Sequence, residues 1–154
     1  KIMGAAIIVP IYRIKPSEGK PSGMGMKPDE NIEKIGMDVS MSYEKENGWT
    51  SEDVHKDNLG FDLRSIRYNE EGTLDDIRYI EAKARAKDGS IRLSANEWKK
   101  AKRFQDRYWL YVVTFAGTSR PKLDRFQNPE KTFRIDEDIY ATGYIIPKEK
   151  LSKR

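Results

Sequence analysis

The first extended pattern of hydrophobic and polar positions along the chain has a helical period. Four apolar residues recur at spacings of three and four: Ile32, Ile35, Val39 and Tyr43. Side chains at this spacing lie on one face of a helix, and Gly48, which follows the pattern, is the residue type that helix C-termini favour. The pattern therefore predicts a helix over residues 31–47.

Two strand-like segments follow this helix, over residues 60–67 and 77–83, with turn-forming residues 69–73 between them. This arrangement predicts a β-hairpin. Successive residues of a strand point to opposite faces, so Glu81 and Lys83 share a face. A turn centred near Gly72 brings Asp62 to their level on the neighbouring strand. We therefore expect two carboxylates and one ammonium to converge.

A second helix and a buried strand complete the central pattern. Ser94 and Glu97 have the spacing of a capping box, and Trp98 opens a new run of apolar residues at helical spacing. Residues 108–115 are rich in β-branched and aromatic types with little polar alternation, which is typical of a strand covered on both faces. The helix cap explains Glu97 well, and a place at the rim of the hairpin's polar cluster is the alternative.

The remaining segments set the expected domain limits. An apolar run interrupted by Pro10 predicts a strand near a sheet edge within residues 1–15, and the Pro- and Gly-rich residues 16–28 predict a flexible loop. The main domain is expected over residues 29–147. Residues 121–129 look irregular, residues 140–146 predict a last strand, and residues 148–154 form a charged tail.

Composition removes several classes of site. The 154 residues suffice for one domain with a hydrophobic core. The chain has no cysteine, which excludes disulfides and thiolate zinc sites, and His55 is its only histidine, which argues against a histidine triad. We expect His55 in an exposed loop, with proton transfer as its less favoured role. The sequence shows neither a membrane-spanning run nor a secretion signal, so we expect a cytoplasmic protein. Because Lys1 is no initiator methionine, we expect a fragment of a larger polypeptide.

Positive charge gathers on the second predicted helix, although the net charge is only +4. The basic residues there are Lys99, Lys100, Lys102, Arg103 and Arg107. A basic helix beside the hairpin could follow a phosphate backbone, so these residues are candidates for contact with nucleic acid. The alternative is an ordinary solvated helix face, since acidic residues lie in the same region.

The expected cluster on the hairpin suits metal-dependent cleavage of a phosphodiester. Asp62 and Glu81 offer the hard oxygen ligands that Mg²⁺ prefers, with Mn²⁺ as its substitute, and the carbonyl of Ala82 could complete the shell. Lys83 could orient the attacking water or neutralise charge that develops on phosphorus. Glu44, late on the first helix, could act as a third acid or simply face solvent. The competing interpretation is a hairpin with charges in solvent, because 35% of the residues are charged.

Several ordered motifs resemble one family. They are Tyr43-Glu44, Gly48-Trp49, Asp53-Val54, Gly60-Phe61-Asp62, Ile80-Glu81-Ala82-Lys83, residues 93–98 and residues 108–113. The chain resembles the C-terminal domain family typified by the plant protein NO VEIN, which is similar to PD-(D/E)xK restriction-endonuclease-like domains. The resemblance implies that Glu44 is the first-helix acid and that Asp62, Glu81 and Lys83 are the motif residues. Phe61 stands where restriction enzymes often carry proline.

The resemblance also implies a fold and a biological setting. The expected class is α/β, with a restriction-endonuclease-like core (αβββαβ), a central mixed sheet flanked by helices, and an extra N-terminal strand. Two functions remain open. The first is a metal-dependent nuclease domain acting on DNA within a larger helicase-like or restriction and defence protein. The second is a catalytically inactive nuclease-fold module that binds nucleic acid or a partner domain.

Overall fold

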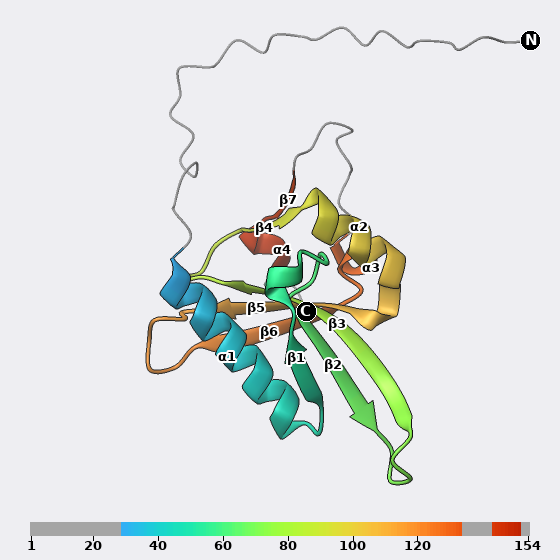
Figure 1. Ribbon diagram of the computed structural model, residues 1–154. Coiled ribbons are helices and arrows are strands. Elements are labelled where there is room, and N and C mark those ends of the chain that lie inside the picture. The colour runs from blue at the N-terminus through green and yellow to red at the C-terminus, as the bar shows by residue number, and fades with distance from the viewer. Residues whose placement is uncertain (1–28, 134–142, 152–154) are drawn as a thin grey trace, which may run out of the picture.

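A mixed β-sheet of five strands forms the centre of the computed structural model, which describes residues 29–133 and 143–151 (Figure 1). The strands are β1 (Thr50–Asp53), β2 (Leu63–Tyr68), β3 (Leu74–Ala84), β5 (Tyr108–Thr114) and β6 (Lys122–Gln127). They lie in the order β1-β2-β3-β5-β6; β3 and β5 run parallel, and the other neighbours are antiparallel. The predicted segments over residues 1–15 and 16–28 lie outside the described residues.

Helices and a second, two-stranded sheet flank this central sheet. The helices are α1 (Glu30–Glu46), α2 (Ala95–Phe104), α3 (Pro129–Phe133) and α4 (Lys148–Leu151), and the 3-10 turns are η1 (His55–Asp57) and η2 (Gln105–Arg107). The second sheet pairs β4 (Ile91–Ser94) with β7 (Gly143–Ile146) in antiparallel fashion. The expectation of an α/β fold with a central mixed sheet flanked by helices is therefore confirmed.

Helix α1 is defined at both ends by local hydrogen bonds. The Asp29 side chain caps its start by accepting from the backbone amide of Asn31 at 3.1 Å. At its end Gly48 has a φ of +79°, and the amide of Trp49 donates to the carbonyl of Glu44 at 2.9 Å. This is the Schellman arrangement that a glycine favours, so the predicted helix ends where the sequence indicates.

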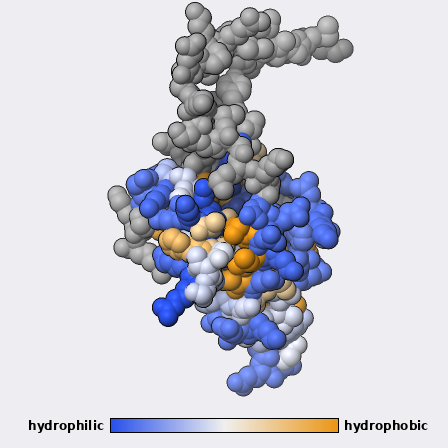
Figure 2. Space-filling view, turned by 90° about the vertical axis from the view of Figure 1, so that its left-hand side faces the viewer, coloured by the Kyte–Doolittle hydropathy of each residue, from blue (hydrophilic) through white to orange (hydrophobic). Residues whose placement is uncertain are grey.

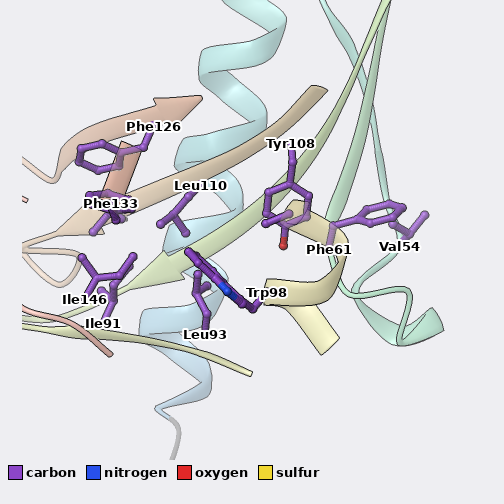
Figure 3. Packing of buried hydrophobic residues seen from close by; sticks show 12 residues of the cluster. Val54, Phe61, Ile91, Leu93, Trp98, Tyr108, Leu110, Phe126, Phe133 and Ile146 are labelled. Atoms are coloured by element: carbon purple, nitrogen blue, oxygen red, sulfur yellow. The ribbon is translucent and has the colours of Figure 1, made fainter. Parts of the chain in front are cut away.

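The two faces of the central sheet are covered by different elements. Helix α1 packs over Leu63, Ile80 and Tyr111, which alternate with residues of the opposite face. On that opposite face Trp98 of α2 and residues of the small sheet pack against Tyr108 and Leu110, as Figure 3 shows. Burial on both faces explains why β5 lacks polar alternation, as the sequence predicts.

The segment after β5 differs from the irregular structure expected over residues 121–129. Residues 122–127 form β6, which pairs antiparallel with β5. Its alternation is hard to recognise in the sequence because charged residues occupy both faces. In the structure Phe126 is buried, and Leu123 packs against the hydrophobic cluster under α1. Hydrogen bonds to β5 satisfy the polar backbone groups of β6 that face this strand. The residue types of this segment alone do not predict a strand.

The chain end that the sequence predicts as a charged tail begins as a short helix. Leu151 in α4 packs against the main hydrophobic core, and Lys148 forms an ion pair with Asp88 at 2.6 Å. The expected strand over residues 140–146 is present as β7 in its described part, and residues 134–142 and 152–154 lie outside the described ranges.

The face in Figure 2 is largely hydrophilic around a small apolar patch. Within the described ranges 29–133 and 143–151, no helix is both long enough and apolar enough to cross a bilayer.

Candidate functional site

Asp62 lies just before β2 and is fixed by backbone hydrogen bonds on both sides. Its amide donates to the carbonyl of Ile80 at 2.9 Å, and its carbonyl accepts from the amide of Val54 at 2.8 Å. Its carboxylate accepts from the amide of Ala82, with Oδ2 2.9 Å from the nitrogen. The hairpin therefore holds the Asp62 carboxylate beside the Glu81-Ala82-Lys83 segment of β3.

Glu81 and Lys83 project from β3 on the same face and contact each other. Lys83 Nζ lies 2.6 Å from Glu81 Oε1, and the Glu81 residue is only 3% exposed. The carboxyl groups of Glu81 and Asp62 are close enough that each influences the pKa of the other. The structure thus brings Asp62, Glu81 and Lys83 together, with the hairpin geometry that their spacing predicts.

Glu97 is a fourth charged residue of this cluster. Its Oε2 accepts from the amide of Ser94 at 2.9 Å, while Ser94 Oγ accepts from the amide of Glu97 at 3.2 Å. The same Oε2 lies 3.1 Å from Lys83 Nζ. Glu97 therefore completes the predicted capping box and contacts the site as well. The sequence predicts the helix cap as the main role of Glu97. Its contact with Lys83 cannot be predicted from residue spacing, because the two residues lie on different elements.

Burial and mutual interaction shift the pKa values of the cluster. Desolvation raises the pKa of Glu81 well above its usual range and also raises the pKa of Asp62. Burial would lower the pKa of Lys83, but the charges of Glu81 and Glu97 outweigh this effect and raise it. Two desolvated acids beside one retained ammonium form an environment that favours an additional cation.

Glu44 is placed away from this cluster, contrary to the expectation that it acts as a third acid there. Its carboxylate is fully buried, with Oε1 3.0 Å from Arg78 Nη1 and accepting a hydrogen bond from the hydroxyl of Tyr111. Arg78 and Glu81 are three residues apart on β3, so they point to opposite faces of the sheet. Glu44 therefore belongs to the α1 face, where Arg78 also stacks on Trp49 at 3.8 Å.

An open cleft of about 920 Å³ leads to the cluster between α1, the end of β1 and β3. Seven acidic residues line it, namely Glu30, Glu33, Asp38, Asp53, Asp62, Glu81 and Glu97. The basic residues of its lining are Lys34, Lys56 and Lys83, together with His55. The sequence does not mark the acids on the first half of α1 as site residues, because their spacing is that of an ordinary solvated helix face.

His55 lies at the cleft in η1, where Asp53 orients it. The carboxylate of Asp53 is 2.5 Å from His55 Nδ1 and also accepts from the His55 amide at 3.1 Å. The expectation that His55 occupies an exposed segment after β1 agrees with its 46% exposed side chain. Its ring is also part of the cleft lining.

The predicted basic residues lie on and just after α2. Lys99, Lys102, Arg103 and Arg107 are exposed. Lys100 is half-buried against Gly60, whose φ is +82° and whose missing Cβ would lie 2.6 Å from Lys100 Cγ. This contact places α2 against the loop that carries Asp62.

The donor set at the cluster is compatible with a magnesium ion but is small. Within the part of the chain that is described, no three or more His, Cys, Asp and Glu side chains form a metal-holding group. Mg²⁺ commonly uses only one or two carboxylates and completes its shell with water and substrate phosphate. Asp62 and Glu81 could supply those two carboxylates, and Glu81 already pairs with one cation, the ammonium of Lys83.

Comparison with known protein families assigns the chain to one of them. The family model described as "Protein NO VEIN, C-terminal" matches residues 32–126, more than half of the sequence. The chain belongs to this family. The NO VEIN C-terminal match contains α1 from Ile32 onward, the hairpin, α2, β5 and nearly all of β6. It therefore contains the cluster of Asp62, Glu81, Lys83 and Glu97. No curated protein and no solved structure matches the chain.

Proposed function

We propose that this chain is a metal-dependent nuclease domain that cleaves DNA. The observation that carries this proposal is the position of the Asp62 carboxylate, which the amide of Ala82 holds beside Glu81. Strand β3 presents Glu81 and Lys83 on one face, so a buried acid, a half-buried acid and an ammonium meet in the cleft. Metal ligands beside a positive group suit metal-dependent hydrolysis of a phosphodiester.

The arrangement of elements supports the proposal. Omitting the small β4, the order α1, β1, β2, β3, α2, β5 is that of an αβββαβ core, and β5 adds parallel to β3. We propose that this is a restriction-endonuclease-like core, in which Asp62 and Glu81 take the positions of the motif acids. The family resemblance further supports a setting within a larger helicase-like or restriction and defence polypeptide.

Each residue of the cluster has a distinct proposed role. Asp62 and Glu81 hold Mg²⁺, or Mn²⁺ in its place, with the Ala82 carbonyl completing the protein ligands. When bound, the metal polarises a phosphate oxygen and lowers the pKa of a coordinated water. Lys83 stays protonated, because neighbouring carboxylates raise its pKa, so it orients the water and neutralises developing charge rather than acting as a base.

Charge around the cleft supports a requirement for divalent cations. The lining carries seven acids against three lysines, so a phosphate backbone is repelled until cations neutralise the acids. The exposed basic residues of α2 then supply sequence-independent contacts to phosphates beside the cleft. DNA binding is therefore expected to require Mg²⁺ at the site. It is also expected to weaken as the salt concentration rises, because salt screens the contacts between α2 and phosphates.

One observation favours the second candidate, a catalytically inactive module that binds nucleic acid or a partner domain. Lys83 already forms ion pairs with Glu81 and Glu97, so these two acids have a cationic partner without a metal. In that case the basic residues of α2 would still bind nucleic acid, and Asp62 would serve only to join the loop to β3.

Cleavage of labelled duplex and single-stranded DNA, measured with Mg²⁺, Mn²⁺ or a chelator, tests the proposal. Asp62→Asn and Glu81→Gln are expected to reduce the cleavage rate by about a hundredfold or more, because each replaces a metal-binding carboxylate with a neutral amide of similar shape. Asp75→Asn, an acid of the exposed hairpin that pairs with Arg67, is the matched control and is expected to keep full activity.

Isothermal titration of Mg²⁺ with the same variants separates the two candidates. Magnesium binding that Asp62→Asn abolishes, together with metal-dependent cleavage, supports the nuclease. DNA binding without cleavage and without mutation-sensitive metal binding would overturn it and favour the binding module.

A further inference from the structure

The capping glutamate of α2 makes one contact that its cap does not require. Glu97 Oε2 accepts from the amide of Ser94 at 2.9 Å and lies 3.1 Å from Lys83 Nζ. A glutamine at this position satisfies a capping box as well as a glutamate does. The negative charge of Glu97 is therefore unnecessary for the helix start, yet it is directed at the ammonium of the cluster.

Lys83 lies between two carboxylates that differ in their surroundings. It contacts Glu81 at 2.6 Å and Glu97 at 3.1 Å, while its own side chain is 25% exposed. Glu81 adjoins Asp62, whereas Glu97 is fixed by the start of α2. A divalent cation at Asp62 and Glu81 would occupy the side of Lys83 that faces Glu81 and would repel its ammonium.

We propose that Glu97 is a positioning residue, which holds the Lys83 ammonium in the cleft when Glu81 turns from Lys83 to a metal ion. This inference rests on the proposed function. Without Glu97, a partly buried ammonium facing the metal has no anionic partner, which is costly, so Lys83 competes with the metal for Glu81. With Glu97, the ammonium keeps a fixed anionic partner when Glu81 turns to the metal, and it remains beside the reacting phosphate.

A cycle of variants in the intact chain measures this coupling through metal affinity. The variants are Glu97→Gln, which keeps the cap, Lys83→Met, which removes the ammonium, and the double variant; Mg²⁺ alone is titrated calorimetrically, with Mn²⁺ as a second probe. Glu97→Gln is expected to weaken Mg²⁺ binding about tenfold in the native sequence. In the Lys83→Met background the same change is expected to alter affinity less than about twofold.

Ser94→Ala is the matched control for the helix cap. It removes the other half of the capping box while leaving the Glu97 carboxylate in place, so it is expected to lower thermal stability but not Mg²⁺ affinity. In DNA cleavage, Glu97→Gln is expected to lower kcat at saturating Mg²⁺ with little change in KM for DNA, which a purely structural cap would not produce.

Equal loss of Mg²⁺ affinity from Glu97→Gln in both backgrounds would overturn this inference, because Glu97 would then act on the metal directly. That outcome leaves the proposed function intact, since Mg²⁺ still binds at Asp62 and Glu81. Absence of Mg²⁺ binding to the native chain, or Mg²⁺ binding that Asp62→Asn leaves unchanged, would overturn both.

Discussion

Two buried glutamates show how surroundings assign different roles to one residue type. Glu44 is enclosed by Arg78 and the Tyr111 hydroxyl on the α1 face, and these contacts satisfy one of its oxygens. Within the described residues, its Oε2 has no hydrogen-bond partner. Glu81 instead borders an open cleft beside Asp62. The first carboxylate therefore stabilises packing between α1 and the sheet, and the second lines the cleft.

Removal of the Tyr111 hydroxyl tests the Glu44 contact through its dependence on pH. Burial and the Glu44 hydrogen bond raise the pKa of Tyr111 above its ordinary value near 10. The unfolded chain therefore loses this proton first, so the contact's stabilisation is complete below pH 10 and declines as pH rises through the higher folded pKa. We expect Tyr111→Phe to lower the free energy of unfolding by about 1–3 kcal/mol at neutral pH.

Denaturant unfolding between pH 7 and 11.5 measures this difference. The gap between the native chain and Tyr111→Phe is expected to stay constant up to about pH 10 and then to narrow. Tyr68→Phe is the control, because Tyr68 is 53% exposed, and it is expected to have little effect at any pH. A gap that widens above pH 10 would contradict the assigned contact.

At the scale of elements, close packing of α1 on β3 defines one wall of the cleft. Gly36 lies inside α1, and a Cβ added there would be 2.5 Å from the Cβ of Ala84. Ala84 is the last residue of β3 and follows Lys83 directly. The absence of a side chain at Gly36 therefore fixes how closely the helix approaches the strand that carries the site.

Gly36→Ala tests this packing because two physical effects oppose each other. Helix propensity favours alanine by about 1 kcal/mol, whereas overpacking against a rigid Cβ costs about 1–3 kcal/mol. We expect net destabilisation of about 1 kcal/mol in denaturant unfolding, together with weaker Mg²⁺ binding as α1 moves relative to β3. Ser42→Ala on the exposed side of the same helix is the control, and a stabilised Gly36→Ala variant would disprove the close contact.

At the scale of the whole molecule, charge is distributed unevenly around the proposed site. The cleft lining is acidic, whereas exposed lysines and arginines gather on α2. Since α2 packs against the loop that carries Asp62, a polyanion held by α2 would lie close to the cleft. In the proposed nuclease, this arrangement assigns phosphate binding to α2 and metal binding to the cleft.

Charge reversal on α2 tests the proposed nucleic-acid contact. Lys99 and Arg103 are four residues apart and both exposed, so they share one side of the helix. The variant Lys99→Glu, Arg103→Glu is expected to weaken DNA binding for every sequence and to reduce the slope of log affinity against log salt by about two. Fluorescence anisotropy at several salt concentrations measures this slope.

The variant Lys45→Glu, Arg120→Glu carries the same change in net charge on exposed residues outside α2. It is expected to leave the salt slope within experimental error of the native value. Equal effects of the two variants would show that net charge alone, and not the surface of α2, determines binding.

The sequence by itself determined the features that depend on spacing within one element or across one turn. The period of three and four residues identifies α1, Ser94 and Glu97 identify the start of α2, and the turn near Gly72 sets the level of Asp62 relative to Glu81. Backbone geometry fixes such relations locally, so the convergence of Asp62, Glu81 and Lys83 could be predicted.

Only the tertiary structure decided which side chains from distant elements meet. It directed Glu44 to Arg78 on the opposite face of the sheet, brought Glu97 to Lys83, and paired β6 with β5. Periodicity states which residues share a face of an element, but not which neighbour covers that face or how far a helix extends across a sheet. Those choices follow from packing and from satisfaction of buried charges, which involve the whole chain at once.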